Sequence, residues 1–111
     1  MLNDYEIFEM HADFCKTIAS SRRLMIIELL AKREMSVGEI AEKLGVQPSN
    51  ISQHLRVLRT HNVVLARKEG QTVFYSLTNQ RLPKVCEEIR SILLDGMETK
   101  GRKARVLNKK K

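Results

Sequence analysis

The chain has 111 residues and a formal net charge of +7, with 42% hydrophobic and 30% charged residues. This length and mixture are typical of one small globular domain, and they exclude a multidomain enzyme with a large catalytic cleft. The first ten residues are acidic and lack the layout of a secretory signal, and no apolar run is long enough to cross a bilayer. We therefore expect a cytoplasmic protein that has no membrane partner.

The excess positive charge is concentrated in residues 100–111, which contain no acidic residue. Such a segment cannot bury enough apolar surface to fold, so it predicts a basic flexible tail that attracts polyanions or only keeps the protein in solution. Residues 1–99 then form the folded domain. Within that domain, residues 50–75 are more basic than the acidic first 13 residues, which favours contact of this middle segment with phosphate.

Two helices are predicted at the start of the chain, over residues 4–19 and 21–33. The first carries two adjacent stripes of apolar residues at helical spacing, so it needs burial on more than one side. The second has one apolar face, which contains Leu24, Ile27, Leu30 and Ala31. Its start is marked by Ser20 and Ser21, whose side chains can cap the first free amides.

Residues 36–59 contain the signals of a helix, a tight turn and a second helix. Ser36 followed by Glu39 forms a capping box, which begins the first of these helices. Gly45 ends it, because glycine adopts a left-handed conformation without steric cost. Pro48 fits the first turn of the second helix, where a missing N–H is no loss. The buried stripe of that second helix is predicted to consist of Ile51, Leu55 and Leu58.

A β-hairpin is predicted over residues 63–68 and 72–77, with residues 69–71 as its turn, and a last helix over residues 80–97. The expected fold is therefore mainly α with a β-hairpin wing, a winged helix-turn-helix. The first and last helices carry more apolar surface than such a small core can cover. A symmetric homodimer, in which these two helices bury their apolar faces against the partner, is the simplest way to cover this surface. The alternative is that the two helices close the core of a monomer.

The second helix of a helix-turn-helix enters the major groove of double-stranded DNA, and its outward face is polar here. Asn50 and Gln53 each have the donor and acceptor pair that matches adenine, and Arg56 matches guanine or a phosphate. Polar and basic residues also flank the hairpin tip. The candidate DNA contacts are Ser49, Asn50, Ser52, Gln53, His54, Arg56, Arg67, Lys68, Gln71 and Thr72. The alternative is an ordinary solvated helix face and hairpin.

Four segments, RRLMIIELL, SVGEIAEKLGV, SNISQHLRVLR and KEGQTVFYSL, follow one another between residues 22 and 77. With these motifs the chain resembles the ArsR/SmtB family of dimeric winged-helix transcriptional repressors over roughly residues 10–97. The resemblance implies a homodimer built on the first and last helices, which binds an imperfect palindrome and leaves it when an inducer binds. Its two recognition helices would lie about one helical turn of DNA apart, roughly 34 Å.

This chain lacks the residues with which members of the ArsR/SmtB family bind metals or sense persulfides. Their positions correspond here to Ser36, Gly38 and Ala41 for thiolate sensors, to Asn79, Arg81, Ile92 and Asp95 for zinc-type sensors, and to Glu28 and Leu94 for persulfide sensors. None of these residues is a cysteine or histidine, and Arg81 would repel a cation. We therefore expect no metal site of these kinds and no cofactor.

Cys15 on the first helix and Cys86 on the last remain as candidate sensing residues. If the two helices meet at a dimer interface, oxidation to a disulfide, or capture of a thiophilic metal or metalloid inducer, would shift them and re-space the recognition helices. In the metal interpretation His11, four residues before Cys15, supplies a third ligand. The alternative is that both cysteines are small core residues. His61 is interpreted as a favourable charge at a helix end.

The chain is not expected to be an enzyme, because it contains no nucleophile elbow, phosphate loop, HExxH or CxxC motif. The main rival to a repressor is a basic nucleoid-type or RNA-binding winged-helix protein without an effector. That protein would show weak sequence preference and a steep salt dependence. A winged helix used only for protein contacts is disfavoured by the polar recognition face and the basic residues near it.

Overall fold

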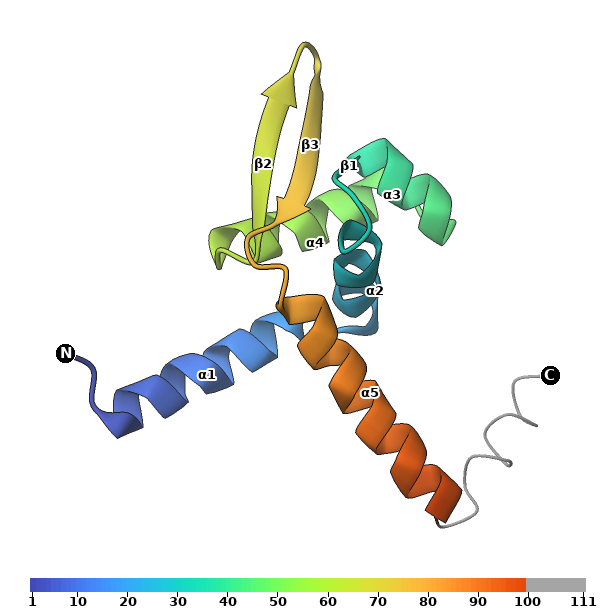
Figure 1. The fold of residues 1–111 in the computed structure, drawn as a ribbon. Coiled ribbons are helices and arrows are strands. Elements are labelled where there is room, and N and C mark those ends of the chain that lie inside the picture. Colours follow the sequence, from blue (N-terminus) through green and yellow to red (C-terminus); the bar gives the residue numbers. More distant parts are fainter. Residues whose placement is uncertain (100–111) are drawn as a thin grey trace. The chain divides into compact units, whose positions relative to one another are not determined.

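The computed structural model describes residues 1–99, and the predicted basic tail, residues 100–111, lies outside the described residues (Figure 1). The chain divides into two units, Met1–Gln80 and the residues from Arg81 onward. The first unit contains α1 (Asp4–Ile18), α2 (Ser21–Leu30), β1 (Met35–Ser36), α3 (Val37–Leu44), α4 (Pro48–Thr60), β2 (Val64–Glu69) and β3 (Thr72–Leu77). The second unit contains α5 (Leu82–Thr99).

The first helix, α1, agrees with its predicted range to within one residue. Asn3 caps it, because its side chain accepts a hydrogen bond from the Glu6 amide over 2.9 Å. The helix extends away from the rest of its unit (Figure 1), and Thr17 near its end is its one buried residue. Its large exposed apolar side chains are Tyr5, Ile7, Phe8, Met10 and Phe14. Its own unit therefore leaves both predicted apolar stripes uncovered.

The second helix, α2, is shorter than predicted. It ends at Leu30, so the expected extension over residues 31–33 is wrong. The chain leaves the helix there because Met35 enters the sheet, where it is 2% exposed and pairs with Tyr75. This tertiary pairing outweighs the local helical preference. The predicted cap is confirmed, because the Ser20 hydroxyl accepts a hydrogen bond from the Arg23 amide over 3.3 Å.

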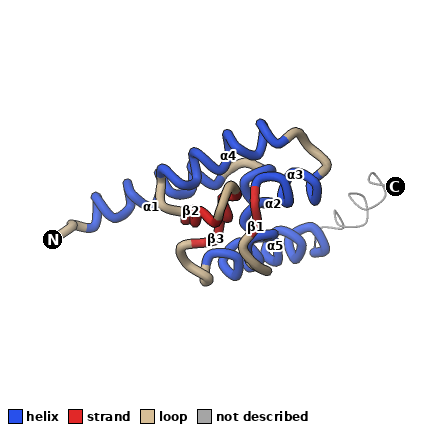
Figure 2. The backbone as a smooth tube through the Cα atoms, turned by 90° about the horizontal axis from the view of Figure 1, so that it is seen from above, coloured by secondary structure: helices blue, strands red, loops and turns tan. Residues whose placement is uncertain are grey.

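The helix-turn-helix follows the sequence signals closely, and Figure 2 shows α3 and α4 joined by a short loop. The Ser36 hydroxyl accepts from the Glu39 amide over 3.2 Å, and the Glu39 carboxylate accepts from the Ser36 amide over 3.1 Å. Gly45 ends α3 in the left-handed region, with φ of 66°. Pro48 lies in the first turn of α4. The capping box, the glycine stop and the proline start are all confirmed.

The core of the first unit lies where α2, α3 and α4 pack together beneath the sheet. α3 packs against α4, and α4 also contacts α2 and β2. The completely buried side chains, with 0% exposure, are Ile26, Ile27, Ile40, Ile51, Leu55 and Leu58. The predicted inward stripe of α4 is therefore confirmed.

The sheet is antiparallel and three-stranded, in the order β1-β3-β2, rather than a lone hairpin. β1 was not predicted because two residues are too few to show strand alternation. The hairpin turn is also tighter than expected. Glu69 pairs with Thr72, so Gly70 and Gln71 alone form the turn, and Gly70 has the positive φ of 61° that such a turn favours.

The last helix, α5, covers Leu82–Thr99 instead of residues 80–97. The later start fits Pro83, which is tolerated in a first turn. Cys86 is buried, and the large exposed apolar side chains of the helix are Val85, Ile89, Ile92, Leu93 and Leu94. A search of residues 1–99 finds no helix with the length and apolar character needed to span a membrane.

Candidate nucleic-acid interface

The buried stripe of α4 determines which of its side chains face outward. Because Ile51, Leu55 and Leu58 are completely buried, the opposite side of the helix is held against solvent. The structure places five of the predicted contact residues on this exposed side, namely Ser49, Asn50, Ser52, Gln53 and Arg56. The helix thus presents amides, hydroxyls and a guanidinium from one rigid element, which suits recognition of base edges and phosphates.

His54 on α4 differs from these neighbours because it is half-buried and already has a partner. Arg23 on α2 donates a hydrogen bond from Nε to His54 Nδ1 over 3.1 Å. Burial lowers the pKa of the imidazole below its ordinary 6.5, and the positive charges of Arg23 and Arg22 lower it further. The ring is therefore neutral at pH 7. Since Nδ1 accepts, the ring proton is on Nε2, which can donate a hydrogen bond.

Arg23 also reaches the end of α1. Its Nη1 donates to the Thr17 backbone carbonyl over 2.8 Å, and the Thr17 hydroxyl donates to the Asp13 carbonyl over 3.0 Å. One guanidinium therefore joins the last turn of α1 to α4 through α2. These contacts position α4 relative to α1 within the first unit.

The wing carries the remaining predicted contacts. Gln71 and Thr72 are exposed at the hairpin tip, and Lys68 is exposed on β2 opposite Val73. Arg67 lies on β2 opposite Phe74, and its guanidinium carbon is 5.0 Å from the centroid of that ring. Lys68, Gln71 and Thr72 therefore lie where a nucleic acid can reach them.

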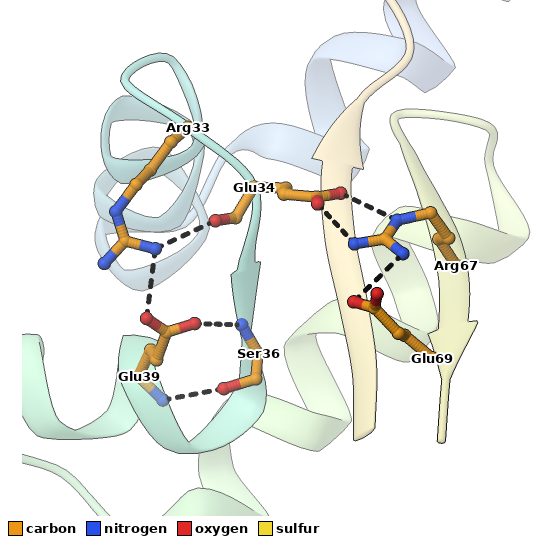
Figure 3. Close-up of polar contacts among 6 residues, drawn as sticks. All are labelled: Arg33, Glu34, Ser36, Glu39, Arg67 and Glu69. Atoms are coloured by element: carbon orange, nitrogen blue, oxygen red, sulfur yellow. Dashed lines mark hydrogen bonds and ion pairs between the residues drawn. The ribbon is translucent and has the colours of Figure 1, made fainter. Parts of the chain in front are cut away.

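Arg67, in contrast, is held by carboxylates of its own chain (Figure 3). Its Nη2 and Nε donate to the two oxygens of Glu34 over 2.5 and 3.3 Å, and its Nη1 lies 3.3 Å from Glu69. The hydrogen bond from Arg67 lowers the pKa of the Glu34 carboxyl below its usual value. The contact connects the segment before β1 to the wing. The side chains of Arg67, Glu34 and Glu69 are all accessible to solvent, so their two ion pairs contribute little to stability.

A second network in Figure 3 stabilises the start of α3. Arg33 Nη1 donates to the Glu34 carbonyl and also lies 3.0 Å from a carboxylate oxygen of Glu39. The amide of Ser36 and then Arg33 lower the pKa of the Glu39 carboxyl. The capping box is therefore extended by a third residue, which holds the first helix of the helix-turn-helix in place.

Three residues that sequence reasoning missed join the predicted ones in a groove between α4 and β3. The groove has a volume of about 530 Å³ and is lined by Ser52, Arg56, Arg59, Thr60 and Tyr75. Helical spacing relates the four residues from α4, so Arg59 and Thr60 could have been found by extending the outward face of the helix. Tyr75 could not, because its position depends on how the strand packs over the helix.

The two thiols lie in different units. Cys15 is exposed on α1, and Cys86 is buried on α5. Where side chains are described, over residues 1–97, no three His, Cys, Asp or Glu residues are grouped so that they could hold a metal ion. His11 is exposed on α1, and His61 is the C-cap residue of α4. A meeting of the two cysteines at a dimer interface stays a prediction.

The family model, the relatives and the solved structures that match this chain indicate the same family. The model described as "Bacterial regulatory protein, arsR family" matches residues 20–64. The nodulation protein NolR of Rhizobium meliloti is 37% identical over 91 residues, which are 82% of this chain and 75% of the relative.

Solved structures of similar fold indicate the same family. The crystal structure of Rv0081 from Mycobacterium tuberculosis matches this chain with a TM-score of 0.75 at 35% sequence identity. The match covers 85% of this chain and 95% of that one. The homodimeric winged helix-turn-helix DNA-binding domain of Mb0332 from Mycobacterium bovis has a TM-score of 0.74 at 26% identity, over 88% of this chain and 93% of that one. The chain therefore belongs to the ArsR family of winged helix-turn-helix transcriptional regulators.

Proposed function

We propose that the protein is a homodimeric repressor that binds a palindromic DNA operator sequence-specifically through α4 and the β2–β3 wing. The observation that carries this proposal is the division of α4 into two faces. Its apolar stripe is completely buried, while Asn50, Gln53 and Arg56 are exposed on the same helix. A rigid helix with outward amides and a guanidinium is suited to direct readout in the major groove.

Side-chain chemistry suggests which residues contact bases and which contact the DNA backbone. Asn50 and Gln53 read bases, because a carboxamide can pair with adenine through one donor and one acceptor. Ser49 and Ser52 in the first turns of α4, and His54 through Nε2–H, supply further hydrogen bonds. Lys68, Gln71 and Thr72 on the wing reach the minor groove or the backbone, and these contacts hold the protein in register along the duplex.

The proposed homodimer is supported by the apolar side chains that the described chain leaves uncovered. On α1, Tyr5 is 71% exposed and Phe8 is 67% exposed. An apolar surface of this kind on one helix favours burial against a second copy. The related domain of Mb0332 is itself homodimeric. A dimer places two recognition helices on two half-sites, which is why a palindromic operator is expected.

We further propose that a thiol-directed signal releases the repressor from DNA. Cys15 is exposed on α1, the helix that Arg23 joins to α4, so a change at this thiol has a contact route to the recognition helix. The signal is either oxidation, or binding of a thiophilic metal or metalloid at Cys15 and Cys86. Cys86 is buried and would react only after local opening.

The test is fluorescence anisotropy of the reduced and the mildly oxidised protein on DNA from upstream of its own gene, with scrambled DNA as the control. A repressor binds the upstream DNA far more tightly at physiological salt. Loss of binding on oxidation in the wild type, but not in Cys15→Ser, supports the thiol switch. Equal affinity for both DNAs contradicts the proposal and favours a nucleoid-type protein. Specific binding that ignores oxidation contradicts the oxidation switch, and the same assay with a thiophilic metal or metalloid then decides between a metal signal and a structural role of both cysteines.

A further inference from the structure

The groove between α4 and β3 contains an unusual local charge. Among the described residues, its lining includes Arg56 and Arg59 and no acidic residue. Two other arginines of the first unit are paired with carboxylates, Arg33 with Glu39 and Arg67 with Glu34. Among residues 1–97, whose side chains are described, neither Arg56 nor Arg59 has such an ion pair. Two guanidinium charges therefore border one groove without compensation.

Hydroxyl groups complete the lining. Neither the Ser52 hydroxyl nor the Tyr75 phenol makes a hydrogen bond with any described residue, so both can donate to a ligand. The Thr60 hydroxyl already donates to the Arg56 carbonyl over 2.8 Å. The Thr60 proton is therefore already engaged, and its hydroxyl is not counted among the donors available to a ligand. The free groups are thus two cations and two hydroxyl donors.

The chemistry of these groups matches a phosphate. Guanidinium groups bind phosphate oxygens through paired N–H donors, and hydroxyls add single hydrogen bonds. The groove is open to solvent and lies between α4 and the β2–β3 hairpin, which stands on α4 in Figure 1. A duplex that contacts both of these elements would carry its sugar–phosphate backbone across the groove.

We propose that this groove binds a phosphodiester of the DNA backbone, with Arg59 and Tyr75 as contacts additional to Arg56 and Ser52. The inference builds on the proposed DNA-binding function and assigns a specific role within it. Phosphate contacts set register and affinity but carry no base information. Arg59 therefore contributes equally to binding of every DNA sequence, whereas Gln53 determines which sequence is preferred.

The test uses the full chain with Arg59→Gln and Tyr75→Phe, and with Lys43→Gln as a control that removes an exposed charge from α3. Affinity is measured on operator and scrambled DNA over a range of salt concentrations. Arg59→Gln is expected to weaken both complexes by the same factor, about tenfold, and to reduce the slope of log affinity against log salt by about one. Tyr75→Phe is expected to weaken both about threefold with an unchanged slope. Lys43→Gln is expected to leave the affinities and the slope close to those of the wild type.

A neutral methylphosphonate, introduced at one backbone position at a time, locates the contact. At one position per half-site it should weaken the wild type but cause no further loss in Arg59→Gln. Wild-type affinity and slope in Arg59→Gln, or a loss confined to operator DNA, overturn the groove assignment. Failure of the proposed function looks different, because the wild type would then show no preference for the operator over scrambled DNA.

Discussion

Arg23 of α2 donates a hydrogen bond to Nδ1 of His54 on α4, and the same guanidinium donates to the Thr17 carbonyl at the end of α1. The recognition helix is thus tied to α1, which carries exposed apolar side chains. In a dimer formed through α1, this side chain would give a change at α1 one contact route to α4, beside the direct contacts of the two helices. Burial, together with the nearby positive charges, lowers the pKa of His54 and keeps the ring neutral, and the contact at Nδ1 leaves the ring proton on Nε2 as a donor.

The lowered pKa of His54 predicts a pH dependence of stability. Above pH 6.5 the ring is neutral in both the folded and the unfolded chain, so its full contribution to stability is present. As the pH falls below 6.5 the unfolded chain binds a proton first, and stability is lost until the pH passes the lower pKa of the folded protein. At fixed protein concentration, the urea midpoint of the wild type should fall more over this window than that of His54→Gln. Parallel curves for the two proteins would contradict the prediction.

Glu34→Gln is predicted to strengthen DNA binding. The substitution removes one of the two carboxylates that pair with Arg67, and with it a negative charge that repels phosphate. Affinity should rise about two- to fivefold, and the salt slope should steepen by up to about one as Arg67 gains a phosphate contact. Salt titrations by anisotropy measure both quantities. Glu42→Gln removes an equal charge from the exposed surface of α3 and serves as the control. Weaker binding by Glu34→Gln would show instead that the ion pair positions the wing.

Gln53→Ala is predicted to relax base preference. The side chain lies on the exposed face of α4, where a carboxamide can pair with adenine. Its removal should cost about 1–3 kcal/mol on the operator and much less on scrambled DNA. Competition binding against operators with one base pair changed measures the loss. If every operator variant keeps its rank and relative affinity, base reading resides in other residues.

Two glycines of the helix-turn-helix are predicted to respond to alanine in opposite directions. Gly45 has φ of 66°, a conformation that costs an alanine about 1 kcal/mol or more. Gly38 lies inside α3, and an added Cβ would meet the Ser36 hydroxyl at an ordinary 3.9 Å. Gly38→Ala should therefore stabilise the fold by about 0.4–1 kcal/mol, and Gly45→Ala should destabilise it. Urea unfolding at one protein concentration compares the pair, and a shift of the same sign for both would refute the assignment.

The helix-turn-helix could be predicted from the sequence because its signals are local. Ser36 and Glu39 satisfy each other's amides within one turn, Gly45 supplies a left-handed stop, and Pro48 supplies a helix start. Each signal depends on the geometry of a few consecutive residues. The outward face of α4 followed directly, since three buried positions at helical spacing determine the opposite side.

The early end of α2, the third strand and the arginine contacts arise from residues far apart in the chain. β1 exists because Met35 pairs with Tyr75, and Arg67 is held by Glu34, 33 residues away. No periodicity encodes such pairs, because strand register and side-chain reach are set only when the core closes. Local signals thus predicted the helix-turn-helix and the outward face of α4, and four motifs carried the resemblance to the ArsR/SmtB family. Which of the arginines on α4 and the wing have a carboxylate partner was decided by the packing of the wing, which places carboxylates beside Arg67 and none of the described ones beside Arg56 and Arg59.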